Sequence, residues 1–244
     1  MERSRLEHSK NIGQSHGYVL RVDTMQEIHA NITLFLAEYG VIRAVAYGAQ
    51  KNTSKLRPIT RFFQQCEVLI DFRPSIPRIV ECKPFEYTDE FVLSVVQLHI
   101  ISIWAECICV MQRGIEGNEQ TLRLLDRAYY RLISSEQSRA LLIHVLFMWR
   151  LFGFMGIRPA IEVNARFFNV SQLEFEDEKS ASSIAISSEC AAILFACTYQ
   201  HIETMKQESF SEAGYREAWK IIKKILEETL GYSLKSVLAS RSVL

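Results

Sequence analysis

Residues 17–84 contain short runs in which apolar and polar positions alternate. In the run 28–36 every second residue is apolar, which is the period of a strand with one buried face. Runs of similar character cover 18–23, 41–47, 62–70 and 78–82. Five strands within so short a segment predict a small Greek-key barrel of the OB type.

The spacing of apolar residues becomes helical after residue 84. The run 91–111 follows the N-cap signals Thr88 and Asp89 and predicts a helix. It is long enough to cross a membrane, but it contains Gln97, His99 and Glu106, whose cost in lipid favours a helix buried in protein. Further helices are predicted over 118–133, from 135 through 149 to the 153–156 region, and over 189–205, 215–230 and 233–238.

These patterns predict an α+β chain with two domains. Residues 1–16 are polar and are expected to form a flexible leader, 17–84 the OB-type barrel, and 85–244 an all-α helical domain. Residues 162–187 lose all periodicity and contain a short acidic run. We expect this segment to be an irregular, solvated lobe of the helical domain.

Charge is distributed unevenly although the net charge is zero. Residues 1–80 carry 11 Lys and Arg against 7 Asp and Glu, whereas residues 81–244 carry 17 against 21. A modest basic excess on the barrel fits contacts to phosphates. Six scattered cysteines without a CxxC pair or a secretory signal favour reduced thiols in a cytoplasmic protein.

The basic candidates cluster in and near one predicted loop of the barrel. The segment 48–55 cannot bury an apolar face, so it should be exposed. Its cations, with those of neighbouring strands, would neutralise phosphates of single-stranded DNA, and Tyr47 or Phe35 could stack on bases. The expected DNA-binding residues of the barrel are Arg21, Arg43, Tyr47, Lys51, Lys55, Arg57 and Arg61. Two alternatives stay open: Arg21 and Arg43 as ordinary surface charges, and Phe35 as a core residue.

A second basic feature lies on the helix predicted over 118–133. Arg123, Arg127 and Arg131 are four residues apart and therefore share one face. This stripe is the best candidate for anion binding in the helical domain. The alternative is a solvated face whose arginines pair with Glu119 and Asp126.

The chain lacks recognisable catalytic apparatus. No Walker loop, GxGxxG, HExxH or GxSxG motif is present, so a non-catalytic role is expected. Cys190, Cys197 and His201 could share one helix face, but three ligands do not close a metal site, and core packing is the favoured interpretation. A protein-interaction adaptor, whose barrel binds a partner protein, is the alternative function.

Four passages give the chain a resemblance to the RecO family of bacterial recombination mediators. They share order and spacing with the family, and together they span most of 17–244. The passages are 19–21 with 32–35 and 39–40, 46–49 leading through the basic loop to Leu56-Arg57-Pro58, 151–159, and Leu230-Gly231 with Leu234-Lys235-Ser236.

The resemblance implies a function in DNA repair and a set of partners. Family membership implies binding of single-stranded and double-stranded DNA, annealing of complementary strands, and cooperation with RecR. It also implies binding to the C-terminal tail of the single-stranded-DNA-binding protein, help in loading RecA, and a cytoplasmic, nucleoid-associated location in a bacterium.

One family feature is missing. Many members bind zinc through two CxxC pairs after the position of Pro159, but 161–168 contains no cysteine, Asn164 stands near the first ligand position, and the second pair is absent. We therefore expect no structural zinc and no other cofactor. The lobe should instead be held by packing of Phe167, Phe168 and Phe175.

Overall fold

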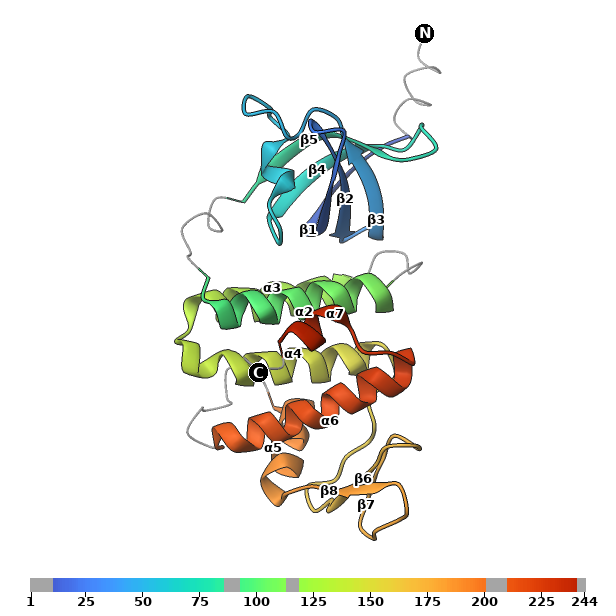
Figure 1. Cartoon of the computed structure of the whole chain (residues 1–244), viewed down its shortest axis with the longest axis vertical. Coiled ribbons are helices and arrows are strands. Elements are labelled where there is room, and N and C mark those ends of the chain that lie inside the picture. The colour runs from blue at the N-terminus through green and yellow to red at the C-terminus, as the bar shows by residue number, and fades with distance from the viewer. Residues whose placement is uncertain (1–10, 86–92, 113–118, 201–209, 241–244) are drawn as a thin grey trace. The chain divides into compact units, whose positions relative to one another are not determined.

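The computed structural model describes residues 11–85, 93–112, 119–200 and 210–240. Its N-terminal part is a closed five-stranded barrel (Figure 1). The strands are β1 (Ile12–Met25), β2 (His29–Leu36), β3 (Gly40–Ala46), β4 (Gln65–Asp71) and β5 (Arg78–Pro84), in the order β1-β2-β3-β5-β4. β3 and β5 pair in parallel, and the other neighbours are antiparallel. The OB-type barrel and the α+β class are confirmed.

The barrel core follows the alternation in the sequence. Ala30, Ile32, Leu34 and Leu36 of β2 point inward and are fully buried with residues of the other four strands. The register pairs Ile32 with Val22 on one side and with Ala44 on the other, so the apolar faces of neighbouring strands coincide. Ile28, by contrast, lies before β2 and is exposed.

β1 begins earlier than the sequence pattern indicates. Residues 12–16 lie in this strand and pair with β4, so the leader expected over 1–16 is wrong for this part. Residues 1–10 lie outside the described residues. The inward positions here are Gly13, Ser15 and Gly17, which carry no hydrophobic signal. Gly17 lies so close to β2 that an added Cβ would be 2.9 Å from the carbonyl carbon of Phe35.

Hydrogen bonds to a buried carboxylate stabilise the turn from β4 to β5. Asp71 has a side chain that is 2% exposed and accepts hydrogen bonds from Arg73 at 2.8 Å and Arg78 at 2.9 Å. The hydrogen bond from Arg73 is the main cause that holds the pKa of Asp71 well below its usual range. Both arginines are therefore ion-paired with Asp71 and stabilise the fold.

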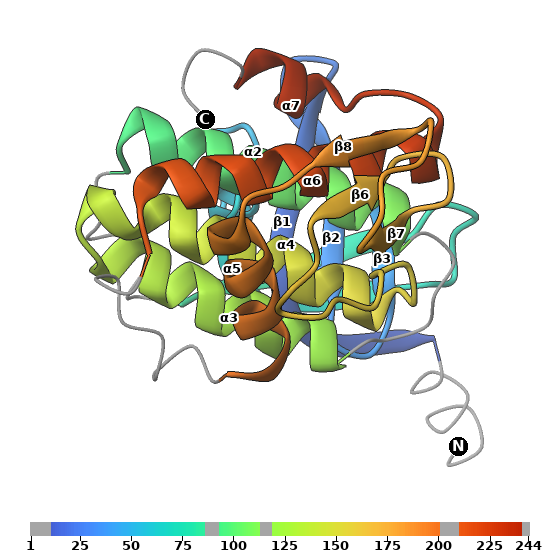
Figure 2. The same ribbon diagram turned by 90° about the horizontal axis from the view of Figure 1, so that it is seen from below.

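The helical part of the chain contains six main helices in the described residues. Its main helices are α2 (Val95–Met111), α3 (Glu119–Ser134), α4 (Ala140–Phe154), α5 (Ser188–Tyr199), α6 (Glu212–Leu230) and α7 (Lys235–Ala239). α4, α5 and α6 pack on one another, and Figure 2 shows α6 crossing the other two. None of the helices in the described ranges is long and apolar enough to cross a membrane.

The helix ends follow local sequence signals. The hydroxyl groups of Ser187 and Ser211 accept hydrogen bonds from backbone N–H groups in the first turns of α5 and α6. Gly231 ends α6 in the left-handed conformation, with φ of 73°, which glycine adopts without steric cost. Gly231 is therefore the C-cap of α6.

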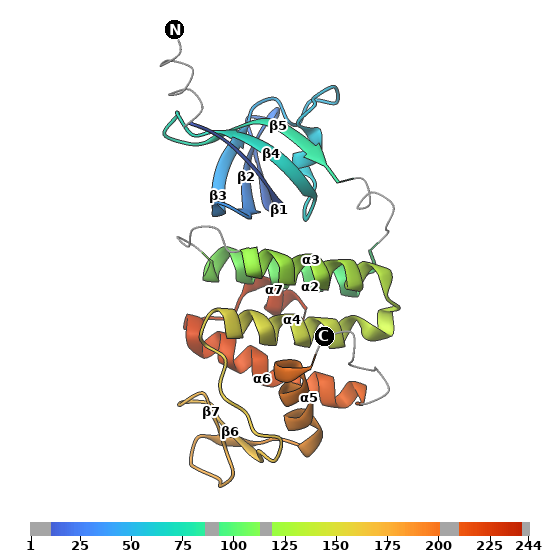
Figure 3. The ribbon, with the colours of Figure 1, turned by 180° about the vertical axis from the view of Figure 1, so that it is seen from behind.

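The lobe over 162–187 is more regular than expected. Three short strands, β6 (Phe167–Asn169), β7 (Glu174–Glu176) and β8 (Ser183–Ala185), form an antiparallel sheet in the order β7-β6-β8 (Figure 2). Figure 3 shows β6 next to β7. Phe168 is fully buried and packs on Phe175, with ring centroids 5.0 Å apart. The buried Asn169 side chain donates to Gln172, Glu176 and Ser180. Hydrogen bonds and aromatic packing thus hold this sheet together.

The chain divides into two compact units. One contains 1–92 and 104–123, and the other contains 93–103 and 124–244. Because the division runs through α2 and α3, it does not coincide with the boundary expected between residues 84 and 85. We retain that boundary as a proposal for the limit of the barrel.

Candidate nucleic-acid interface

Two arginines lie in one row across three strands of the barrel. Thr33 of β2 pairs with Arg21 of β1 and with Arg43 of β3, and directly paired residues point to the same face. Ile32 and Leu34, which flank Thr33, point into the core. The two arginine side chains therefore lie on the outer face, where both residues are exposed.

The two charges in this row are not equivalent. The guanidinium of Arg21 donates two hydrogen bonds of 2.9 Å to Asp23 on the same strand, which offsets much of its charge. Over the ranges that the structure describes, Arg43 has no ion-pair partner. Arg43 is consequently the better placed of the two to meet a phosphate.

The basic loop is anchored at both ends by the core. Gly48 turns the chain with φ of 69°, and its backbone N–H donates to Nδ1 of His29 at 2.8 Å. Ala49 and Ile59 are fully buried in the barrel core, and residues 57–60 form the short 3-10 helix η1 (Arg57–Thr60). The intervening polar residues are held at the surface, as the sequence predicts.

The cations of this loop face solvent. Lys51, Lys55, Arg57 and Arg61 are all exposed. Within the described part of the chain, neither lysine has an ion-pair partner. Arg57 donates to the side-chain oxygen of Asn52, a neutral acceptor that leaves its positive charge intact. Within the described residues, no carboxylate therefore neutralises Lys51, Lys55 or Arg57.

The two expected stacking residues differ in their surroundings. Tyr47 is 55% exposed, and its ring meets His29 edge-on with centroids 5.2 Å apart. Phe35 is fully buried and pairs across the sheet with Tyr18, so its ring has no free face. The proposed stacking role of Phe35 is wrong, and the alternative of a core residue is correct.

Sequence reasoning missed one exposed aromatic residue. The alternation predicts a strand over 62–70, but β4 begins only at Gln65. Phe62 lies in the turn before it, with 43% of its surface exposed. It follows Arg61 directly and packs on the buried Phe63, with ring centroids 5.7 Å apart. Its position after the basic loop was the available signal.

The arginine stripe on α3 is only partly available. Arg123 donates to Glu119 at 2.6 Å, one turn earlier on the same helix. Arg127 is exposed, whereas Arg131 is half-buried. The alternative of a solvated, paired face therefore holds for Arg123, and the three residues do not form one uniform basic surface.

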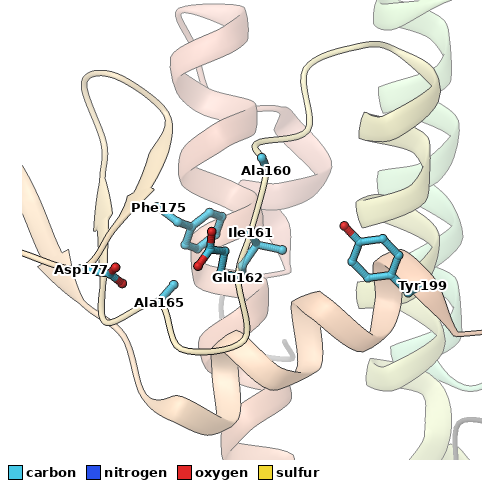
Figure 4. Close-up of a pocket in the computed structure, with 7 residues that line it drawn as sticks. All are labelled: Ala160, Ile161, Glu162, Ala165, Phe175, Asp177 and Tyr199. Atoms are coloured by element: carbon cyan, nitrogen blue, oxygen red, sulfur yellow. The ribbon is translucent and has the colours of Figure 1, made fainter.

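The helical part contains a pocket of about 440 Å³ with an unsuitable charge for DNA. Figure 4 shows Glu162, Asp177 and Tyr199 among the residues that line it. Two carboxylates without a lining cation would repel a phosphate. The pocket is therefore not part of the candidate interface.

Metal binding has little support in the described residues. No group of three or more His, Cys, Asp or Glu side chains among them could hold a metal ion. Cys190 and Cys197 are fully buried, and burial raises the pKa of each thiol to about 12. They are thiols inside the core at neutral pH, and His201 lies outside the described residues.

Comparisons with known proteins agree with this geometry. Residues 11–87 match the family model described as Recombination protein O N terminal, and this range covers all five barrel strands. A protein of Nostoc punctiforme named DNA repair protein RecO is 23% identical over 153 residues, which is 62% of this chain and 51% of that protein. The chain is similar to RecO proteins, and its barrel matches the N-terminal part of that family.

Two further RecO proteins show the same level of similarity. The one from Nostoc sp. (strain PCC 7120) is 24% identical over 152 residues, which is 60% of this chain and 51% of that protein. The one from Gloeothece citriformis is 22% identical over 149 residues, which is 61% of this chain and 53% of that protein. The chain thus spans about half the length of the curated RecO relatives it matches.

Proposed function

We propose that this chain is a RecO family protein that acts as a non-catalytic mediator of recombination in DNA repair, and that its barrel binds single-stranded DNA. The observation that carries the proposal is the anchored loop of the barrel, where Lys51, Lys55 and Arg57 are exposed and, within the described residues, have no carboxylate partner. The match of the barrel to the family model and the names of the relatives support the repair function.

The proposed binding mode combines cations with one or two aromatic rings. The phosphates of a single strand would contact the three cations of the loop and Arg43. Tyr47 lies in the turn directly after β3 and is exposed, so it can stack on a base. Phe62, which follows Arg61, is a second exposed ring for this purpose.

The wider activities of the family are part of the same proposal. We infer binding of double-stranded DNA, annealing of complementary strands, cooperation with RecR, capture of the tail of the single-stranded-DNA-binding protein, and help in loading RecA. Arg61, Arg127 and Arg131 are retained as secondary DNA contacts, and Arg21 and Arg123 as weaker ones because each is ion-paired. No catalytic step and no cofactor are required.

Charge reversal in the loop tests this proposal. We expect Lys51→Glu and Lys55→Glu each to weaken binding of a fluorescently labelled single-stranded oligonucleotide about tenfold, because an attractive contact becomes a repulsive one. The matched control is Lys83→Glu, the same charge change at an exposed position of β5. The control should change the affinity less than twofold, and circular dichroism should show all three variants folded.

The same experiment separates the mediator from the adaptor alternative. If the barrel binds a partner protein instead of DNA, the unmodified chain will show no saturable binding of the oligonucleotide. Equal effects of the loop variants and of Lys83→Glu would also reject the loop as the binding surface.

A further inference from the structure

His29, the first residue of β2, holds the chain at the point where the basic loop begins. Its Nδ1 lies 2.8 Å from the backbone nitrogen of Gly48. Because a backbone N–H can only donate, Nδ1 is the unprotonated acceptor of this hydrogen bond. The imidazole is half-buried and meets the ring of Tyr47 edge-on, with centroids 5.2 Å apart. His29 therefore contacts the first residue of the loop and the aromatic residue that precedes it.

The neighbouring residues add two further connections between the loop and the barrel. The backbone N–H of Gln50 donates to the carbonyl of Ile28 at 3.1 Å. Ala49, which lies between Gly48 and Gln50, is fully buried in the barrel core. Residues 48–50 are thereby held at the start of β2. Of these connections, only the hydrogen bond to His29 is made by a polar side chain.

The cations of the loop are connected to Gly48 through consecutive backbone turns. Each turn is closed by an N–H that donates to the carbonyl three residues earlier: Lys51 to Gly48 at 3.2 Å, Ser54 to Lys51 at 3.0 Å, and Arg57 to Ser54 at 3.1 Å. Each turn begins at the residue where the previous one ends. The places of Lys51 and Arg57 therefore depend, turn by turn, on the place of Gly48.

Backbone hydrogen bonds, and not ion pairs, order these cations. Within the described residues, no carboxylate pairs with Lys51, Lys55 or Arg57. An exposed polar loop without such a framework would have to lose conformational freedom when a ligand binds. A loop that is already ordered avoids this loss, which increases affinity without adding a contact.

We propose that His29 is a positioning residue of the barrel site: its hydrogen bond to Gly48 fixes the loop 48–57 in the arrangement that contacts a single strand of DNA. This inference rests on the proposed binding of single-stranded DNA by the loop. His29 acts through the backbone of the loop, so the effect requires no contact between the imidazole and a phosphate.

Two substitutions separate the two contacts of His29. His29→Asn retains a side-chain oxygen that can accept from Gly48 but has no ring, whereas His29→Phe retains a ring beside Tyr47 but has no acceptor. We expect His29→Phe to weaken binding of a labelled single-stranded oligonucleotide about tenfold, because binding must then order the loop. The affinity of His29→Asn should stay within about threefold of that of the unmodified chain.

Two further variants are the controls for folding and for the site. His16→Phe is the same substitution at an exposed histidine of β1, and it should bind as the unmodified chain does. In a chain that already carries Lys51→Glu and Lys55→Glu, His29→Phe should cause little additional loss of affinity, because the loop no longer binds. A general loss of folding would instead lower the affinity in both backgrounds.

Hydrogen exchange followed by mass spectrometry reports the order of the loop without any DNA. In His29→Phe, the amides of residues 48–57 should exchange about tenfold faster, because the side-chain hydrogen bond that holds Gly48 is lost. Exchange in β2 and β3 should not change. His29→Asn should retain the exchange of the unmodified chain. Faster exchange throughout the barrel in His29→Phe would indicate a purely structural role and would contradict the proposal.

The proposal is overturned if His29→Phe binds the oligonucleotide as tightly as the unmodified chain, whether or not its loop exchanges faster. It is also overturned if His29→Asn loses as much affinity as His29→Phe. Failure of the proposed function gives a different result: the unmodified chain then shows no saturable binding, and the positioning role of His29 in DNA binding fails with it, while the exchange data still show whether His29 orders the loop.

Discussion

At the scale of single residues, exposure decides which side chains can act on a ligand. Tyr47 and Phe35 are both aromatic residues of the barrel, yet Tyr47, in the turn after β3, is half exposed and Phe35, in β2, is buried. Residues 32–36 of β2 are all buried, so both faces of this strand are covered. A pattern in which every second residue is apolar predicts a strand with one face exposed to solvent. Because both faces of β2 are covered, the sequence could not decide between stacking and core packing for Phe35.

Tyr47 gives the first prediction at this scale. Removal of its ring by Tyr47→Ala should weaken binding of a single-stranded oligonucleotide by about 1–3 kcal/mol, the contribution typical of one stacked base. Tyr47→Phe retains the ring and should remain within about twofold of the unmodified chain. Equal losses in both variants, measured by fluorescence anisotropy, would argue against stacking.

His144 gives a prediction about stability. Its ring is fully buried in α4 and meets Trp219 with centroids 4.2 Å apart. Burial, together with the charge of Lys223, lowers its pKa from 6.5 to about 3. The unfolded chain therefore binds a proton on this imidazole below about pH 6.5, whereas the folded chain does not. The contribution of neutral His144 to the free energy of unfolding is fully present above about pH 6.5 and is lost as the pH falls toward 3.

Protonation of His144 in the unfolded chain should lower the free energy of unfolding by about 2 kcal/mol between pH 7 and pH 5. His144→Leu should remove this part of the pH dependence, as measured by urea unfolding at several pH values. His16→Gln, at an exposed position of β1, is the control and should retain it. An unchanged pH dependence in His144→Leu would contradict the account.

At the scale of elements, strands and helices were predictable wherever apolar residues recur with a regular period over a long run. The centres of the five strands and the helical character of α2 to α7 follow from the spacing of apolar residues. The start of β1 does not, because its inward residues at 13, 15 and 17 are glycine and serine. β6, β7 and β8 contain three residues each, which is too short for a period to appear.

Glycine substitutions test the account of these elements. Gly17→Ala should cost about 3 kcal/mol or more, because the new methyl group collides with the carbonyl of Phe35 across the β1–β2 pair. Gly231→Ala should cost only about 1–2 kcal/mol, since it meets no atom within 4 Å and has only the left-handed conformation to overcome. Equal costs in chemical unfolding would contradict the close strand contact.

The candidate sites were predictable to different degrees. The exposed loop with Lys51 and Lys55 follows from composition, because a polar segment cannot be buried. The neutralisation of Arg21 by Asp23, and of Arg73 and Arg78 by Asp71, depends on side-chain geometry. The packing of Arg158 against Gly153 depends on a turn of the chain at Gly156, which a pattern of apolar residues does not encode.

At the scale of the whole molecule, the formal net charge is zero. Long-range attraction to a polyanion is therefore weak, and binding must come from local cations. The proposed contacts are Arg43, Lys51, Lys55 and Arg57. Each contact to a phosphate of a single strand releases counterions and adds about −0.7 to the slope of log affinity against log salt concentration.

The salt dependence of single-stranded DNA binding by the unmodified chain is the most direct test of the central claim. Four contacts predict a slope of about −3, so the affinity should fall roughly 50-fold between 50 and 200 mM salt. An affinity that changes less than about threefold over this range would contradict the account, because the barrel loop would then not bind through phosphates.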